Sequence, residues 1–150
     1  MSIADRILRV KSSLPGQVEL VAVSKTYPAQ RIMEAYEAGQ RIFGENRPQE
    51  MAQKYEELPK DIEWHLIGHL QTNKIKKVLG RASLIQSVDS EHLLTAIEKE
   101  AAKAGIVQDV LLEVNIGGEA SKSGVSPEQL WPLLDAAAAE EHIRVKGLMA

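Results

Sequence analysis

The sequence contains no cysteine, and this absence removes several kinds of chemistry at once. Disulfide bridges, thiolate nucleophiles and cysteine-ligated metal sites are excluded, and the composition is compatible with a reducing compartment. Long apolar runs are missing as well, and an acid, Asp5, stands among the first residues. We therefore expect neither a secretion signal nor a membrane span, and we predict a cytoplasmic protein.

An excess of positive charge is also missing. The 150 residues carry a formal net charge of −3, and lysines gather only at Lys74, Lys76 and Lys77. Charge dispersed in this way argues against a general nucleic-acid binder. With 44% hydrophobic and 26% charged residues, the composition is that of an ordinary globular protein. The length suffices for one domain with a real core, so we treat residues 1–150 as a single domain.

One stretch organises the rest of the chain. The apolar run 20–24 ends abruptly at Lys25, and Pro28 then supplies the first-turn residue of a helix. Lys25 is thus predicted where a buried strand opens to solvent. An amine in that place loses hydration, which favours the neutral form that attacks carbonyls and forms Schiff bases. The alternative is a lysine that merely marks the end of the strand and extends its amine into water.

Strand and helix patterns alternate along the whole chain. The predicted strands are 20–24, 41–43, 62–67, 83–87, 110–114 and 143–150. The predicted helices are 3–13, 28–38, 48–58, 72–79, 90–104 and one that begins after Ser126. Ser126, Pro127 and Gln129 form a capped helix start, and Pro132 inside that helix predicts a kink or a break.

Six βα-type units with short connections predict a parallel sheet with helices outside it. Periodicity alone leaves two architectures open, a doubly wound sheet and part of a (β/α)8 barrel. The sequence stops within the apolar run 147–150, where a parallel sheet would expose an edge. Because a barrel of this class needs at least about 200 residues, we predict an α/β chain of (β/α)8 TIM-barrel type, truncated after about six strands.

Polar side chains stand at the end of each of the first five predicted strands. They are Lys25, Glu45, Asn46, His69, Ser87, Asp89, Asn115 and Lys122. The carboxyl ends of parallel strands meet on one face, where α/β proteins keep their sites, so these residues predict a binding site around a lysine. Each has a simpler alternative, since Asn46 and Asp89 or Ser90 can cap the helices that follow them.

Two segments come close to known motifs, the Walker A loop and the zinc-protease motif, but neither matches its motif. Ser121 precedes Lys122, whereas a Walker A loop needs glycine directly before its lysine. His65 and His69 are four residues apart, but Leu66 stands where the zinc-protease motif has glutamate, in a predicted strand rather than a helix. Nucleotide hydrolysis and metal binding are therefore not expected. The lysines around Lys74 are most simply a solvated helix face.

Four motifs in one order resemble the family of pyridoxal phosphate homeostasis proteins, which is similar to the barrel domain of alanine racemase standing alone. They are Val21–Lys25, Phe43–Asn46, Trp64–Lys74, and Val114–Ile116 together with Ser121–Gly124. The resemblance spans the chain from the first helix to Met149. It implies that Lys25 holds pyridoxal 5'-phosphate (PLP) as a Schiff base. It places Asn46 near the cofactor ring and His69 and Asn115 at the same end of the barrel. It also implies that Lys122 is a secondary cofactor contact.

The resemblance also implies a role. Such proteins bind PLP and hand it on in vitamin B6 homeostasis, without an established catalytic turnover, so we expect a non-catalytic carrier. A lysine Schiff base suits this role because it is reversible, and another amine can remove the aldehyde by exchange. The implied partners are PLP and, as candidate recipients, PLP-dependent apoenzymes, for a monomer or weak dimer. The family's chain continues through two further strands whose loops bind the phosphate, so we expect those groups beyond Ala150.

Two alternatives stay open. The first is a PLP-dependent enzyme such as an amino-acid racemase; the related racemases add a second domain and a tyrosine acid–base from a partner subunit, and no second domain is evident here. The second is a protein-interaction module that uses the basic helix near Lys74.

Overall fold

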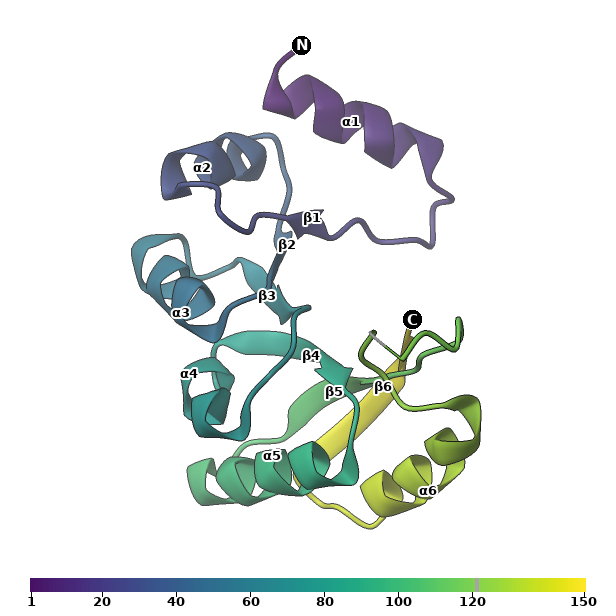
Figure 1. The fold of residues 1–150 in the computed structure, drawn as a ribbon. Helices are drawn as coiled ribbons and strands as arrows, with labels where there is room; N and C mark the ends of the chain where they lie inside the picture. The colour runs from purple at the N-terminus through teal and green to yellow at the C-terminus, as the bar shows by residue number, and fades with distance from the viewer. Residues whose placement is uncertain (121) are drawn as a thin grey trace.

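Six parallel strands form one sheet in the computed structural model of the chain, which describes residues 1–120 and 122–150 (Figure 1). The strands are β1 Ala22–Val23, β2 Ile42–Glu45, β3 Glu63–Leu66, β4 Ala82–Val88, β5 Gln108–Glu113 and β6 Ile143–Met149. The helices are α1 Ile3–Ser13, α2 Ala29–Glu37, α3 Pro48–Glu57, the 3-10 turn η1 Thr72–Lys74, α4 Ile75–Val78, α5 Glu91–Ala104 and α6 Pro127–Ala138.

The order of the strands decides between the two predicted architectures. Each strand pairs in parallel with the next one in the chain, from β1 to β6, with no reversal of direction. A doubly wound sheet would reverse its order at a switch point. Helices α2, α3, α4 and α5 instead follow one another along one side of the sheet (Figure 1). This arrangement is the wall of a (β/α)8 barrel, so the TIM-barrel prediction is confirmed and the doubly wound alternative is wrong.

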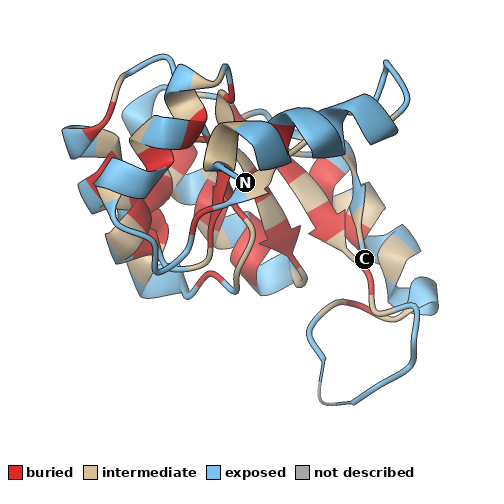
Figure 2. Cartoon of the chain, turned by 90° about the horizontal axis from the view of Figure 1, so that it is seen from above, coloured by how far each residue is buried: buried red, intermediate tan, exposed pale blue. Residues whose placement is uncertain are grey.

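Register places the aromatic core on the helix side of the sheet. Phe43 of β2 pairs with Ala22 of β1 and with Trp64 of β3, so the three side chains share one face. The rings of Phe43 and Trp64 lie 5.9 Å apart, and both residues are buried. Figure 2 shows the same division, with buried residues on the strands and on the inward sides of the helices. The core therefore lies between sheet and helices, which leaves the other face of the sheet to form the barrel interior.

Local capping signals fix several helix ends. Ser90 accepts a hydrogen bond from the Leu93 N–H at 3.1 Å, and Gly105 ends α5 in the left-handed region, with φ of 68°. Ser126 and Gln129 form the expected capping box at the start of α6. These ends are where the sequence predicts them, because each depends on residues within one helical turn.

Other expectations were wrong in detail. The apolar spacing of residues 3–13 predicts one inward face that includes Ile7, Leu8 and Val10, but in α1 Leu8 and Val10 are exposed and Ile7 is the one buried residue. Pro28 caps α2 rather than opening it, and residues 72–79 form a 3-10 turn followed by a single α-helical turn. α6 continues through Pro132 without a break. Pro132 is exposed, so water can solvate the carbonyl group that its missing N–H leaves free.

Candidate functional site

Lys25 lies two residues beyond β1, at the carboxyl end of the strand, as predicted. Its side chain is exposed, so the loss of hydration expected for this amine is not observed. Lys25 forms no ion pair within residues 1–120 and 122–150. The strand end therefore presents an accessible amine that no carboxylate of the described residues pairs with.

Asn46 and His69 lie together at the ends of β2 and β3. Both line a hollow of about 200 Å³ that also includes Lys74. Gly68 makes this approach possible, because a Cβ at its position would lie 2.5 Å from the main-chain oxygen of Asn46. Asn46 does not cap α3, whose N-cap is Arg47, so the capping alternative for Asn46 is wrong. This pair is consistent with a shared binding surface.

Asn115 and Lys122 form a second group, beyond the end of β5. They line a hollow of about 470 Å³ together with Glu113. The Asn115 amide nitrogen donates to the main-chain oxygens of Glu119, at 2.6 Å, and of Lys122, at 3.3 Å. Asn115 therefore holds its own loop together. Ser121, part of the motif quoted for this loop, lies outside the described residues.

The five predicted contact residues thus fall into three places. Asn46 lies with His69, Asn115 lies with Lys122, and Lys25 lines neither of these two hollows. All of them follow the carboxyl ends of strands of the same sheet. The structure therefore brings them to one end of the barrel wall but not into one continuous pocket.

Two of the polar residues predicted at the strand ends, Glu45 and Ser87, are buried instead of facing the candidate site. Glu45 pairs in register with Leu66, whose side chain is fully buried on the helix side, and the Glu45 side chain has no exposed surface. Ser87 is also buried, and its hydroxyl has no hydrogen-bond partner within the described parts of the chain. Sequence alternation did not reveal these orientations, because which face of a strand is covered depends on the partners in the sheet.

A buried ion network that the sequence reading missed lies beneath the Lys25 turn. The Lys54 amine of α3 donates to Glu45 at 2.9 Å and to Glu50 at 2.8 Å. Only 8% of the Lys54 side chain is exposed. One feature of the sequence indicates that Lys54 is buried. Lys54 stands between Met51 and Leu58 at the spacing of the buried stripe of α3, where an apolar residue is the usual choice.

The pKa values of the two acids of this network, Glu45 and Glu50, are shifted in opposite directions. Burial raises the pKa of Glu45, although hydrogen bonds from Ser24 and Lys54 oppose this rise. Burial also disfavours the charged form of Glu50, but hydrogen bonds from Lys54 and from the Thr26 N–H outweigh it and hold the pKa of Glu50 below its usual value. Of the two acids, Glu50 is therefore the one whose charged form the network favours.

On the barrel-interior face, His65 is buried and its Nδ1 lies 2.9 Å from the amide nitrogen of Gln86. Burial lowers the pKa of His65, and the charge of Glu19 opposes this effect.

No cluster of His, Asp and Glu suited to a metal ion occurs among the residues that the structure describes. No helix of these residues is long and apolar enough to cross a membrane.

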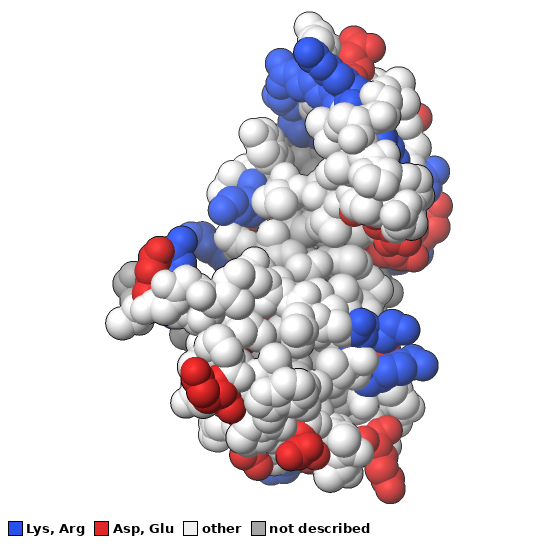
Figure 3. All heavy atoms as spheres, turned by 90° about the vertical axis from the view of Figure 1, so that its right-hand side faces the viewer, with Lys and Arg blue, Asp and Glu red and all other residues white. Residues whose placement is uncertain are grey.

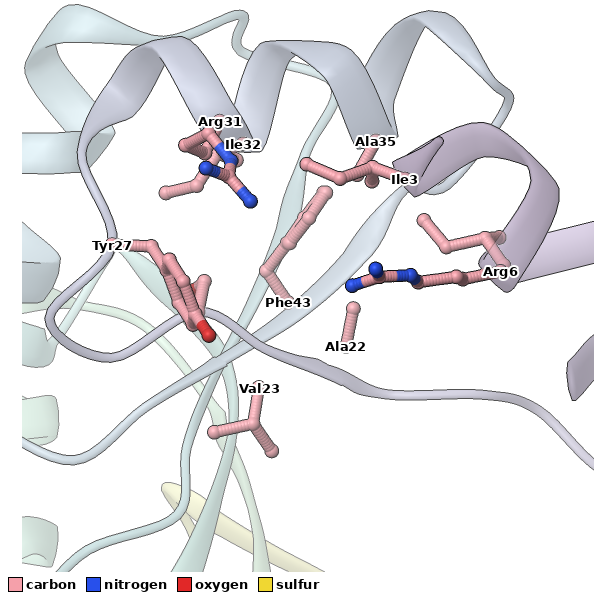
Figure 4. A pocket seen from close by; sticks show the side chains of 11 residues that line it. Ile3, Arg6, Ala22, Val23, Tyr27, Arg31, Ile32, Ala35 and Phe43 are labelled. Atoms are coloured by element: carbon pink, nitrogen blue, oxygen red, sulfur yellow. The ribbon is translucent and has the colours of Figure 1, made fainter. Parts of the chain in front are cut away.

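A third hollow lies on the helix side of the sheet, between α1, α2 and β1. Its volume is about 200 Å³, and Phe43 and Ile32 line it together with Tyr27 and Arg6 (Figure 4). Lys25 is not among its lining residues. This apolar hollow reaches the end of β1 through Val23 and Ser24 but does not include the Lys25 side chain.

Charged side chains are unevenly distributed over one face of the molecule (Figure 3). Figure 3 shows a face of the molecule whose centre is largely uncharged, with lysine and arginine atoms gathered at the upper end, at the height of α1 in Figure 1. α1 carries Arg6, Arg9 and Lys11.

Comparisons of the sequence with known proteins support the motif-based resemblance. Residues 1–150 match the family model described as "Alanine racemase, N-terminal domain". The "Pyridoxal phosphate homeostasis protein" of Aquifex aeolicus (strain VF5) is 48% identical over 132 residues, which cover 87% of this chain and 58% of that protein. The protein of the same name from Schizosaccharomyces pombe is 39% identical over 144 residues, 94% of this chain and 61% of that protein. The chain thus spans about three-fifths of the length of these relatives.

Solved structures give the same result. PipY of Synechococcus elongatus PCC7942, solved without PLP, superimposes with a TM-score of 0.93 at 40% identity, over 99% of this chain and 70% of PipY. The structure of PipY with PLP bound gives a TM-score of 0.90 at 40% identity, over 99% of this chain and 69% of PipY. Alanine racemase from E. faecalis shares the fold, with a TM-score of 0.81 at 14% identity over 97% of this chain and 40% of that one. The chain therefore belongs to the alanine racemase N-terminal domain family and, within it, to the group of the pyridoxal phosphate homeostasis proteins.

Proposed function

We propose that this protein binds PLP through Lys25 and serves as a carrier in PLP homeostasis. One observation carries the proposal: an exposed, unneutralised amine stands at the carboxyl end of β1 in a barrel wall that matches PipY, a protein whose structure is known with PLP bound. In barrels of this type, binding residues gather at that end of the strands. Recipients among PLP-dependent apoenzymes and a cytoplasmic location belong to the same proposal.

The donor groups fit an aldehyde cofactor. PLP supplies an aldehyde carbon that an amine can attack. The Lys25 nitrogen adds to this carbon, and one water molecule leaves as the C=N bond forms. A second amine that attacks the same carbon restores the free Lys25 amine, so the link is reversible. Asn46 offers amide donor and acceptor groups at the neighbouring strand end, and Lys122 offers a second exposed cation beyond β5.

The tyrosines support a carrier over a racemase. Tyr36 donates its hydroxyl to Asp61 at 2.6 Å, and the Tyr55 ring lies beneath the Lys60 amine at 4.1 Å. Tyr27 lines the hollow beside α1 and α2. A racemase needs an acid or base on each side of the substrate α-carbon. The contacts of Tyr36 and Tyr55 support surface-pair roles for these two tyrosines, and we propose a non-catalytic role for the protein.

Absorbance and mass mapping test the proposal. Added PLP is expected to shift its visible absorbance on the protein, and borohydride is expected to fix it on Lys25 in peptide maps. Lys25→Ala should lose both signals, whereas Lys11→Ala, which removes an exposed lysine of α1, should keep them. Absence of any adduct on Lys25 of the unaltered protein would refute cofactor binding at this residue. Exchange of amino-acid α-protons no faster than with free PLP is expected for a carrier, and faster exchange would favour the racemase.

A further inference from the structure

The residue before Lys25 is bound to the buried network of α3. The main-chain oxygen of Ser24 accepts a hydrogen bond from the Lys54 amine at 2.9 Å, and the Ser24 hydroxyl donates to Glu45. The Ser24 N–H donates to the Gly44 oxygen at 3.0 Å, as a continuation of the β1–β2 ladder. The backbone just before Lys25 is therefore fixed by both main-chain and charged side-chain partners.

The residue after Lys25 is bound to the same network. The Thr26 N–H donates to Glu50 at 2.7 Å, and the same Glu50 oxygen accepts from Lys54 at 2.8 Å. Lys25 itself stays exposed between these two anchored neighbours. Lys54 thus reaches both flanks of Lys25, the first directly through Ser24 and the second through Glu50.

The turn is held in a conformation that it would not adopt freely. Thr26 has φ of 66°, in the left-handed region, and it is the one non-glycine residue with positive φ in the described chain. A β-branched residue in this region is a genuine outlier that costs about 1–3 kcal/mol. Such a residue persists only when its surroundings fix it, and the Glu50 bond to its N–H is the contact from another element that does so.

The network is a poor source of stability by itself. The second carboxyl oxygen of Glu45, Oε1, is buried and has no hydrogen-bond partner within the described residues. Burying charged groups with incomplete hydrogen bonding costs folding free energy. Besides holding α3 to the sheet, the network bonds the two residues that flank Lys25, and this second role gives a reason for its cost. Glu45 also directly precedes Asn46, so the network links the ends of β1 and β2.

We propose that Glu50 and Lys54 are positioning residues that fix the Lys25 turn so that the exposed amine is aimed at its aldehyde ligand. This inference rests on the proposed function, because it takes Lys25 to be the residue that attacks PLP. A fixed turn reduces the conformational freedom that Lys25 must lose when it reacts. Neither Glu50 nor Lys54 needs to touch the cofactor for this effect.

Glu50→Ala is the sharpest test because only the Thr26 anchor and one of the three Lys54 bonds are removed. The Glu50 side chain is 23% exposed, so folding should tolerate the change. A lost hydrogen bond to a charged group predicts about tenfold slower borohydride fixing of PLP on Lys25 and about tenfold faster hydrogen exchange of the Thr26 amide. Glu57→Ala is the matched control on the same helix, where the carboxylate pairs with Gln53 at 3.1 Å, and it should change neither quantity.

Conservative replacement separates positioning from mere structural support. Glu50→Gln still offers an oxygen to the Thr26 N–H and should recover most of the fixing rate. Peptide maps of all lysines supply an internal reference, because a general loss of structure would not lower the Lys25 adduct selectively. Lys54→Met provides a second variant, with unfolding curves recorded in parallel to separate a weaker fold from a weaker site.

The outcomes distinguish two failures. If the unaltered protein gives no Lys25 adduct, the proposed function fails and the inference falls with it. If the unaltered protein forms the adduct and Glu50→Ala forms it equally fast, only the positioning inference is refuted. An unchanged Thr26 exchange rate in Glu50→Ala would refute it as well, since the turn would then not be held by Glu50.

Discussion

At the scale of single residues, Gly68 has a steric role that its position in a loop conceals. A Cβ on Gly68 would lie 2.5 Å from the oxygen and 2.8 Å from the Cα of Asn46, both main-chain atoms that cannot rotate away. Gly68 thus lets the end of β3 pack directly against the end of β2. The Asn46–His69 pair at the candidate site depends on this close approach.

Gly68→Ala is therefore expected to be destabilising. The new methyl group forces a backbone shift, and overpacking of this kind costs roughly 1–3 kcal/mol. Urea unfolding measures the free energy, and the variant should also fix less PLP because Asn46 moves. Gly16→Ala is the control, because a Cβ there meets nothing within 4 Å. A Gly68→Ala protein as stable as the control would contradict the steric argument.

Single residues also show where sequence reasoning succeeds. Lys25 could be located from the sequence because an apolar run that ends in lysine is a local pattern. Glu50 and Lys54 could not be placed as easily. Their four-residue spacing is that of an ordinary solvent-exposed helix pair. Only the packing of α3 against the sheet, which joins residues far apart in the sequence, turns this pair inward.

At the scale of elements, helices were easier to predict than strands. α5 and α6 begin at the predicted serine caps, because a cap needs only the first helical turn. β1 has only two residues where five were predicted, and β2 lies one to two residues further along than expected. Strand limits depend on pairing with a neighbour, which a single segment does not contain.

The cap of α5 can be tested by substitution. Ser90→Ala removes the acceptor for the Leu93 N–H and should lower the free energy of unfolding by about 1 kcal/mol. Ser90→Asp retains a capping oxygen and should restore most of the loss. Thr95→Ala, at an exposed position inside the same helix, is expected to have little effect or to stabilise slightly. Equal unfolding curves for Ser90→Ala and the unaltered protein would show that water replaces the cap without cost.

At the scale of the whole molecule, the direction in which successive strands add to the sheet could not be read from periodicity. Doubly wound sheets and barrels both alternate strands and helices, so the same pattern predicts both. The register of β1 to β6 resolves the choice, because each new strand is added on the same side. This one-directional order also gives the sheet two different faces. Phe43 and Trp64 occupy the face covered by helices, and His65 occupies the barrel interior.

Burial of His65 in that interior makes the stability of the whole fold depend on pH. Because burial lowers the pKa of His65 in the folded protein, the unfolded chain binds a proton more readily below pH 6.5, the ordinary histidine value. The free energy of unfolding should therefore fall as the pH drops through 6.5, and this contribution should level off once the pH is below the folded-state pKa. Urea unfolding at pH 7.5 and 5.5 measures the change.

Substitution isolates the contribution of His65. His65→Gln lacks a titrating ring, so its free energy of unfolding should fall less between pH 7.5 and 5.5 than that of the unaltered protein. A general loss of stability in the variant does not disturb this comparison, because only the change with pH is used. His92→Gln, at an exposed position near the start of α5, should keep the unaltered pH dependence. If both variants showed the same dependence as the unaltered protein, His65 would not be held neutral by burial, and the interior of the barrel wall would be open to water.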